Sequence, residues 1–227
     1  MSAVKALQRY SRNSKPVELI PKEIEKYVAE HTSHVSFLLE ELERETYEKT
    51  SIPQMLSGRV EDRLLQMLIR VSGAERVVEI GTFTGYSSLM MAEALPEDGE
   101  LITLEICKKY AEIAKRYFKR SPYSDRIKLI LGPALNSLKQ IPNESIDFVF
   151  IDADKKSYSL YYKESLRILR KGRLIAVDNT LWSGRVLSPQ DADSKAIALF
   201  NEIVKKDESV EKVMLTIRDG LFLIRKK

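Results

Sequence analysis

Apolar residues follow two different spacings along this chain. Within residues 21–71 they recur at the three- and four-residue intervals of an amphipathic helix, as Leu64, Leu65 and Leu68 illustrate. From Arg76 onward, short runs that are apolar throughout alternate with further stretches of helical spacing. The pattern therefore predicts a helical N-terminal region followed by a region that mixes strands and helices.

The apolar runs after Arg76 are too short and too uniform to be surface helices. Uniform apolarity is typical of parallel strands that are covered on both faces. The runs span residues 77–80, 101–104, 127–131, 146–151 and 174–177, and the helical stretches lie near residues 86–95, 108–120, 134–140 and 158–169. Five strands with crossover helices predict a doubly wound α/β sheet.

The C-terminal region adds an antiparallel hairpin to this sheet. A helix is expected near residues 194–206, and two further apolar runs follow at residues 213–217 and 221–224. Arg218-Asp219-Gly220 lies between the two runs and is expected to form the hairpin turn. The complete sheet is therefore expected to have seven strands and to be mostly parallel.

The N-terminal region is expected to contribute helices only. Pro21 suits the first position of a helix, and Thr32 or Ser33 is expected to cap a second one. Because no linker or repeat divides the chain, we expect a single domain over the whole sequence. Residues 1–72 would form a helical cap, and residues 73–227 would form the cofactor-binding α/β core.

Composition narrows the class of protein. The 227 residues carry a net charge of +4 that is spread along the chain, whereas nucleic-acid binding usually requires a concentrated basic face. No apolar run approaches the ~20 residues of a membrane span, and residues 1–10 lack the apolar stretch of a signal peptide. The only cysteine, Cys107, is consistent with a reducing compartment. We therefore expect a cytoplasmic protein that binds neither nucleic acid nor membranes.

The loop after the first predicted strand is suited to a ligand without phosphate groups. Gly81 and Gly85 allow a tight turn and a close approach to the backbone, but Phe83 breaks the glycine pattern of a dinucleotide fingerprint. A carboxylate at Glu79 would repel a pyrophosphate and attract a cation. S-adenosylmethionine fits, because it carries an ammonium and a sulfonium. The alternative is an ordinary strand-to-helix turn with a surface glutamate.

The second predicted strand ends at Glu105, where an acidic side chain can accept hydrogen bonds from ribose hydroxyls. This position indicates an adenosine-containing cofactor. It does not distinguish S-adenosylmethionine from NAD, since both contain adenosine.

Oxygen-bearing side chains follow the fourth and fifth predicted strands. Asp152 comes directly after the fourth, and Asp178 and Asn179 follow the fifth. Neighbouring parallel strands bring their carboxyl ends to one edge of the sheet, so these side chains should converge there. Three oxygen donors favour a hard divalent cation, with Mg²⁺ preferred and Mn²⁺ or Ca²⁺ as alternatives. A structural alternative is that the carboxylates cap helices and pair with Lys155 or other basic side chains.

Several stretches resemble the cation-dependent class I O-methyltransferases, the family of caffeoyl-coenzyme A and catechol O-methyltransferases. The matching stretches are VEIGTFTGYSSL, ILGPAL, FVFIDADKKSY, VDNTLWSG and RDGLFLIRK. They are distributed over most of the chain. The resemblance implies a Rossmann-like methyltransferase sheet, S-adenosylmethionine as cofactor and a bound divalent cation.

The resemblance also implies roles for individual residues. The metal ligands would be Asp152, Asp178 and Asn179, the catalytic base would be Lys155, and Trp182 would lie near the substrate. The cofactor contacts would be Met55, Ser57, Glu79, Gly81, Ser87, Glu105, Ala134 and Asp154. Two departures from the family pattern, a short segment over residues 138–145 and Arg173 in place of a glycine, lie away from these positions.

The implied reaction transfers a methyl group from S-adenosylmethionine to one hydroxyl of a metal-chelated vicinal diol. A free phenol has a pKa near ~10, and coordination to a divalent cation lowers the pKa of a bound hydroxyl. Lys155 would then accept the proton, and the substrate would be a catechol or a hydroxycinnamoyl-type molecule. A homodimer is expected, as in the resembling enzymes.

Three other functions compete with this one. An NAD-dependent oxidoreductase is disfavoured by Phe83 and by the oxygen-ligand cluster. A methyltransferase of exocyclic amines often carries an Asn/Asp-Pro-Pro-aromatic motif after the fourth strand, where this chain has Asp152-Ala153-Asp154 instead. A non-catalytic binding protein on the same fold is the third alternative.

Overall fold

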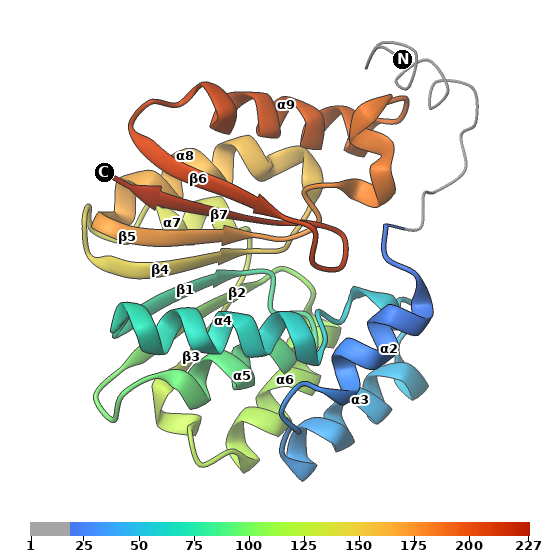
Figure 1. The fold of residues 1–227 in the computed structure, drawn as a ribbon. Coiled ribbons are helices and arrows are strands. Elements are labelled where there is room, and N and C mark those ends of the chain that lie inside the picture. The colour runs from blue at the N-terminus through green and yellow to red at the C-terminus, as the bar shows by residue number, and fades with distance from the viewer. Residues whose placement is uncertain (1–18) are drawn as a thin grey trace.

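A computed structural model describes residues 19–227 as three layers, with helices on both faces of one mixed sheet (Figure 1). Residues 1–18 lie outside the described part, and so do the signal-peptide expectation for residues 1–10 and the start of the expected helical cap. The strands are β1 (Arg76–Ile80), β2 (Glu100–Glu105), β3 (Ile127–Leu131), β4 (Ile146–Ile151), β5 (Leu169–Val177), β6 (Val210–Leu215) and β7 (Leu221–Lys226).

The seven strands follow the order β3-β2-β1-β4-β5-β7-β6. Strands β1 to β5 are parallel, and β7 runs antiparallel to both β5 and β6. The predicted fold class is therefore confirmed. The chain proceeds outward from β1 to β3 and then returns to start β4 on the other side of β1. In open α/β sheets, such a reversal of strand order creates a crevice at the carboxyl ends of the strands.

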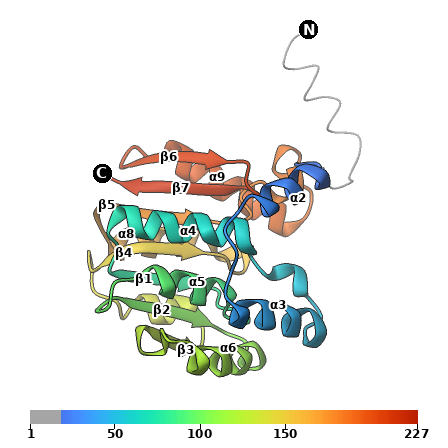
Figure 2. The same ribbon diagram turned by 60° about the horizontal axis from the view of Figure 1, so that its bottom comes forward.

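Helices cover the two faces of the sheet in separate groups. One face carries α4 (Arg59–Ser72), α5 (Tyr86–Ala94) and α6 (Lys108–Arg120), and the other carries α7 (Ala134–Leu138), α8 (Tyr158–Ile168) and α9 (Ala192–Lys206). The N-terminal helices α2 (Lys22–Glu30) and α3 (Phe37–Lys49) lie toward the carboxyl ends of the parallel strands (Figures 1 and 2). None of the helices within residues 19–227 is both long and apolar enough to cross a membrane.

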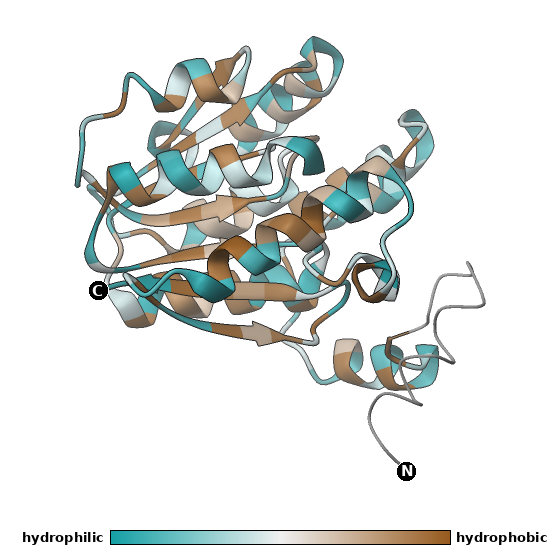
Figure 3. Ribbon diagram, turned by 90° about the horizontal axis from the view of Figure 1, so that it is seen from above, coloured by the Kyte–Doolittle hydropathy of each residue, from teal (hydrophilic) through white to brown (hydrophobic). Residues whose placement is uncertain are grey.

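Side chains of the central strands alternate between two hydrophobic clusters. In β4, Phe148 and Phe150 pack against the α4–α5 face, whereas Val149 and Ile151 pack against the α7–α9 face. This alternation is the two-residue period of a strand that is buried on both faces. Figure 3 shows the result as apolar strands enclosed by helices whose outer residues are hydrophilic.

The structure corrects three expected boundaries. Ser36, and not Thr32 or Ser33, precedes the second described helix, and the Thr32 hydroxyl instead donates to the carbonyl of Val28. Strand β5 is longer than its apolar run, because the chain is already extended from Leu169. Strand β6 starts earlier than expected, at Val210, because the exposed Glu211 and Lys212 interrupt the apolar signal, and it ends at Leu215, before Ile217.

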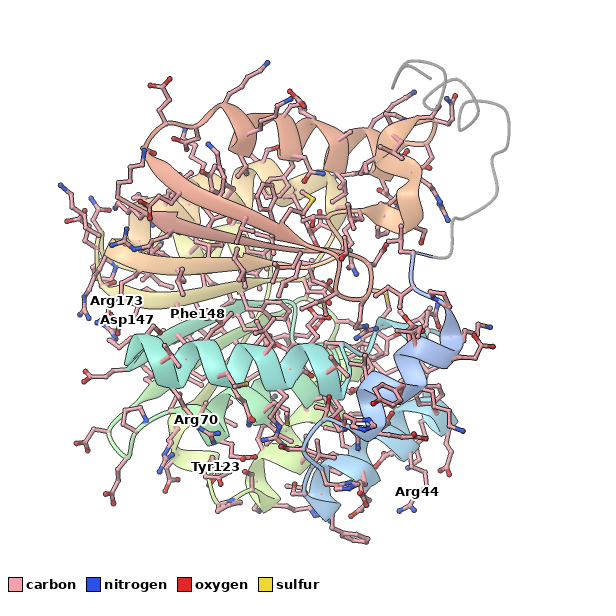
Figure 4. The ribbon with its side chains drawn as sticks, viewed as in Figure 1. Arg44, Arg70, Tyr123, Asp147, Phe148 and Arg173 are labelled. Carbon is pink, nitrogen blue, oxygen red and sulfur yellow. The ribbon has the colours of Figure 1, made fainter. Side chains whose placement is uncertain are left out.

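The amino ends of the strands are held by one buried carboxylate. Asp147, at the start of β4, is 1% exposed and accepts hydrogen bonds from the backbone amides of Glu75 and Arg76 at 3.1 and 3.0 Å. The guanidiniums of Arg170 and Arg173 lie 2.8 and 3.3 Å from it. Figure 4 places Asp147 and Arg173 together at this edge, opposite the carboxyl ends where ligands are expected.

A second buried carboxylate, Glu79, joins β1 to its neighbours at the other end. Its oxygens accept hydrogen bonds from the hydroxyls of Ser87 (2.5 Å), Ser88 and Thr103 (2.5 Å). Ser87 and Ser88 lie in the first turn of α5, and Thr103 lies in β2. Glu79 is fully buried, so this network fixes the helix that follows the first loop.

Glu79 should make the stability of the fold depend on pH in an unusual direction. Burial raises the pKa of its carboxyl from 4.5 to about 7, although the three hydroxyl donors oppose the shift. The folded state therefore holds this proton more tightly than the unfolded state does. The resulting stabilisation is complete below the unfolded pKa and is lost as the pH rises through the folded pKa.

We therefore expect the Glu79→Gln variant to gain stability relative to the wild type as the pH rises. The free energy of unfolding of Glu79→Gln minus that of the wild type should increase by about 3 kcal/mol between about pH 4 and pH 8. The reason is that only the wild type has an ionisable side chain at position 79. Urea denaturation across this range measures the difference. Parallel pH profiles for the two proteins would show that the Glu79 carboxyl titrates in its ordinary range.

Candidate active site

The first cavity lies at the carboxyl ends of β1, β2 and β4, where the strand order reverses. Its volume is about 520 Å³. Gly81 makes the approach of two strand ends possible, because a Cβ at this position would lie 1.8 Å from the carbonyl oxygen of Asp152. The backbone of Gly81 also has a φ of +105°, which favours glycine.

Glu105 forms the wall of this cavity at the end of β2. Its two carboxylate oxygens accept hydrogen bonds from the backbone amides of Phe83 and Cys107, each at 2.7 Å. Burial raises the pKa of the Glu105 carboxyl above its ordinary value, against the effect of these amides. Each oxygen keeps a second lone pair, so the carboxylate is placed to accept from the hydroxyls of a ligand.

Other expected cofactor residues gather around the same space. Met55, Ser57, Gly81, Ser87, Glu105, Ala134 and Asp154 all line the first cavity. Glu79 does not line it, because its carboxylate is turned into the buried hydroxyl network beneath the loop. Its structural effect on the cavity is therefore indirect, through Ser87.

The second cavity adjoins the first and has a volume of about 620 Å³. Asp152, Lys155, Asp178, Asn179 and Trp182 line it. All the expected metal, catalytic and substrate residues are thus brought to one place. Met55, Ser57 and Asp152 line both cavities, so the two spaces share a wall.

Lys155 lines the second cavity between Asp152 and Asn179. Its ammonium donates to Asp152 Oδ1 at 2.9 Å, to Asn179 Oδ1 at 2.5 Å and to the Tyr158 hydroxyl at 2.6 Å. Burial alone would lower the pKa of Lys155, but the negative charges of Asp152 and Asp178 outweigh it and raise that pKa above its ordinary value. With only these protein groups around it, the Lys155 side chain is therefore a protonated ammonium.

Asp178 and Asn179 form a rigid pair at the end of β5. The backbone and side-chain amides of Asn179 donate to the two Asp178 oxygens at 2.5 and 2.9 Å. This leaves Asn179 Oδ1 to accept a hydrogen bond from Lys155. Burial, and then the charge of Asp152, raises the pKa of Asp178 to about 7.

The chemistry of this donor set fits a hard divalent cation. Two carboxylates and one amide oxygen meet beside a cavity, and Asp178 is only 2% exposed. A buried carboxylate is costly unless it is paired or bound to a metal. Within residues 19–227, no three His, Cys, Asp or Glu side chains group closely enough to form a metal site by themselves, so a cation bound here would also need the amide oxygen of Asn179.

Trp182 lies in a segment of unusual backbone conformation. Its indole ring centroid is 5.6 Å from Lys155 Nζ, and it begins the short helix η4 (Trp182–Leu187). Asn179, Trp182 and Ser183 all have positive φ angles, of 58°, 49° and 50°. Non-glycine residues rarely adopt this conformation unless the surroundings hold them there.

Sequence reasoning missed several residues that the structure brings to the cavities. Tyr161 donates to Asp154 Oδ1 at 2.5 Å, and Tyr158 contacts Lys155. Their three-residue spacing after Lys155 was an available signal, since such residues share one face of a helix. Cys107, which the sequence indicated only as a sign of a reducing compartment, also lines the first cavity.

The hairpin residues Arg218 and Asp219 were also missed as site residues. Both line the second cavity, although the sequence suggested only a connecting turn. Nothing in the local pattern shows that this turn reaches the carboxyl end of β5, because that contact depends on the antiparallel pairing of β7.

Known proteins resemble this chain over most of its length. A family profile described as O-methyltransferase matches residues 29–227. The chain is 33% identical over 207 residues to "Probable caffeoyl-CoA O-methyltransferase 1" of Dictyostelium discoideum. The aligned region covers 88% of this chain and 90% of the relative.

Solved structures show the same similarity. An O-methyltransferase from Bacillus cereus, in complex with SAH, matches with a TM-score of 0.83 and 30% identity, over 90% of this chain and 97% of that one. TomG, an O-methyltransferase from Streptomyces achromogenes involved in tomaymycin synthesis and solved with SAM, matches with a TM-score of 0.84 and 27% identity, over 90% and 96%. Together with the matched profile, these similarities show that the chain belongs to the O-methyltransferase family.

Proposed function

We propose that this protein transfers a methyl group from S-adenosylmethionine to one hydroxyl of a vicinal diol chelated by a divalent cation. The diol would be a catechol or a hydroxycinnamoyl-type small molecule. The observation that carries the proposal is the shared wall of the two cavities, in which Asp152 borders both. A methyl donor in the first cavity and an oxygen nucleophile in the second would then face each other, and holding reactants in line is a large part of catalysis.

The first cavity supports S-adenosylmethionine as the donor. Glu105 is placed to accept from ribose hydroxyls, and Phe83 and Tyr110 form an aromatic pair beside it with ring centroids 4.7 Å apart. Asp154, whose carboxylate is steadied by Tyr161, would receive the ammonium of the donor. The two similar structures with SAM or SAH support the same assignment.

Asp152, Asp178 and Asn179 would hold the divalent cation, with Mg²⁺ preferred and Mn²⁺ or Ca²⁺ as alternatives. When bound, the cation would supply positive charge that lowers the pKa of a chelated phenolic hydroxyl. Asp178 and Asn179 are already fixed to each other by two hydrogen bonds. These bonds hold the oxygen donors of Asp178 and Asn179 side by side.

Lys155 would act as the base that receives the proton of the acceptor hydroxyl. Its position between Asp152 and Asn179 supports this role. A base must first be neutral, and positive charge beside Asp152 would lower the pKa of Lys155. Tyr158 would keep the amine in place by accepting from it and donating onward to the carbonyl of Asp178 at 3.2 Å. Trp182 would pack against the acceptor ring.

A homodimer is also part of the proposal. Ile24 and Tyr27 on α2 are 53% and 59% exposed, and Leu199 on α9 and Val213 on β6 are 59% and 52% exposed. On α2 and β6 they offer apolar surface that a second copy of the chain would cover. Light scattering at micromolar concentration should give twice the chain mass of 26.1 kDa, and a mass of 26.1 kDa would contradict a dimer.

Cofactor affinity should depend on Glu105. We expect Glu105→Ala to weaken S-adenosylhomocysteine binding by about 1.5–3 kcal/mol, because charge-assisted hydrogen bonds to the ligand are lost. Isothermal titration calorimetry measures this change. Glu100→Ala is the matched control, since Glu100 starts the same strand at its far end and pairs with Arg76. Equal affinity in Glu105→Ala and Glu100→Ala would remove Glu105 from the ligand site.

Turnover should require both the cation and the second hydroxyl of the acceptor. We expect EDTA to abolish methylation of a catechol and Mg²⁺ or Mn²⁺ to restore it. A monohydroxy analogue should be a poor acceptor, because it cannot close a chelate ring. Asp178→Ala should lose turnover and keep its S-adenosylhomocysteine binding. Asp98→Ala, in the exposed turn before β2, is the matched control and should keep its turnover. Mass spectrometry showing equal methylation of both acceptors in EDTA would contradict the proposal.

A further inference from the structure

The turn between β6 and β7, residues 216–220, touches both walls of the candidate active site. It lies beside the segment that carries Asn179 and Trp182 (Figure 1). Gly220 permits this contact, because a Cβ there would lie 2.5 Å from Leu181 Cγ and 2.8 Å from Leu181 N. The turn is therefore packed directly against the backbone of the acceptor side.

Four hydrogen bonds join the turn to that segment. The amide and hydroxyl of Thr180 donate to the carbonyl of Gly220 at 3.0 and 2.9 Å, and the amide of Leu181 donates to the carbonyl of Asp219 at 2.9 Å. The Asp219 carboxylate accepts from the amide of Ser183. Because Ser183 and its neighbour Trp182 have left-handed backbones, their conformation needs such external support.

Arg218, in the same turn, contacts the segment around Leu56 instead of the segment that carries Trp182. Its guanidinium donates to the carbonyl of Leu56 at 3.1 Å and lies 3.6 Å from the buried carboxylate of Glu61. Leu56 lies between Met55 and Ser57, which line both cavities. Arg218 thus holds the wall that separates the two cavities.

We infer that Arg218 and Asp219 are positioning residues, and that this one turn sets the cavity wall and the Trp182 segment relative to each other. Asp219 acts on the acceptor side through Ser183, and Arg218 acts on the shared wall through Leu56. The inference rests on the proposed function only in placing the acceptor against Trp182. Its central claim, that the turn fixes Trp182, can be tested without any methyl transfer.

Trp182 provides the readout, because it is the only tryptophan in the chain. We expect Asp219→Ala to increase the acrylamide quenching of its fluorescence by about twofold, since the strained backbone is no longer held by its side-chain acceptor. Asp219→Asn should restore the wild-type value, because its Oδ1 still accepts from Ser183. Arg225→Ala is the matched control on the same hairpin, where Arg225 pairs with Glu211 at 2.8 Å away from the site. It should leave quenching unchanged.

Kinetics and ligand binding separate the two residues. Asp219→Ala should lower kcat/KM for a catechol by about tenfold or more, as misplaced acceptors react slowly, with S-adenosylhomocysteine affinity unchanged. Arg218→Ala should also weaken that affinity about fivefold, the equivalent of one lost hydrogen bond. Asp219→Ser replaces the alanine variant if thermal denaturation shows that the latter is unfolded.

Unchanged quenching in folded Asp219→Ala or Asp219→Ser would overturn the inference, whatever the activity. Increased quenching that asparagine does not reverse would also overturn it, because the carboxylate contact with Ser183 would not be the cause. Increased and reversible quenching in a protein that methylates no diol would support the turn's role and count against the proposed function instead.

Discussion

The close approach of β1 and β4 at their carboxyl ends is the constraint on which the site depends. Only glycine at position 81 lets the chain pass the carbonyl of Asp152, and the amide of Asp152 donates to Ile80 at 2.9 Å just below. Because the strand order reverses between these two strands, the segments after β1 and β4 face each other across a crevice. Asp152 consequently borders both cavities, and a donor and an acceptor can be held on either side of it.

Burying acidic side chains at this crevice requires compensating positive charge. Asp178 is 2% exposed and lies close enough to Asp152 for the two charges to disfavour each other. Lys155 balances part of this charge with two direct hydrogen bonds. The remaining negative charge would favour a cationic ligand over a pyrophosphate at this edge of the sheet. The family assignment agrees, since it decides for a transferase over an NAD-dependent oxidoreductase.

Much of this arrangement could be predicted from sequence because parallel strands impose a simple rule. Short apolar runs mark the strands, and the carboxyl ends of neighbouring parallel strands lie at one edge, so the sequence alone could place Asp152, Asp178 and Asn179 together. Contacts made by folding back over the sheet have no such signature. The turn at Arg218 reaches the site only because β7 inserts antiparallel beside β5, and Glu79 faces a buried hydroxyl network because of its register along β1.

Cation binding by Asp152, Asp178 and Asn179 is the central claim, and titration with Mn²⁺ followed by electron paramagnetic resonance tests it most directly. The wild-type chain, with S-adenosylhomocysteine present, should remove a single Mn²⁺ per chain from the free signal. Asp178→Ala should weaken Mn²⁺ binding by about tenfold or more, because a charged ligand is lost. Its affinity for S-adenosylhomocysteine should stay the same. Equal Mn²⁺ binding by the two proteins, or none by the wild type, would contradict the account.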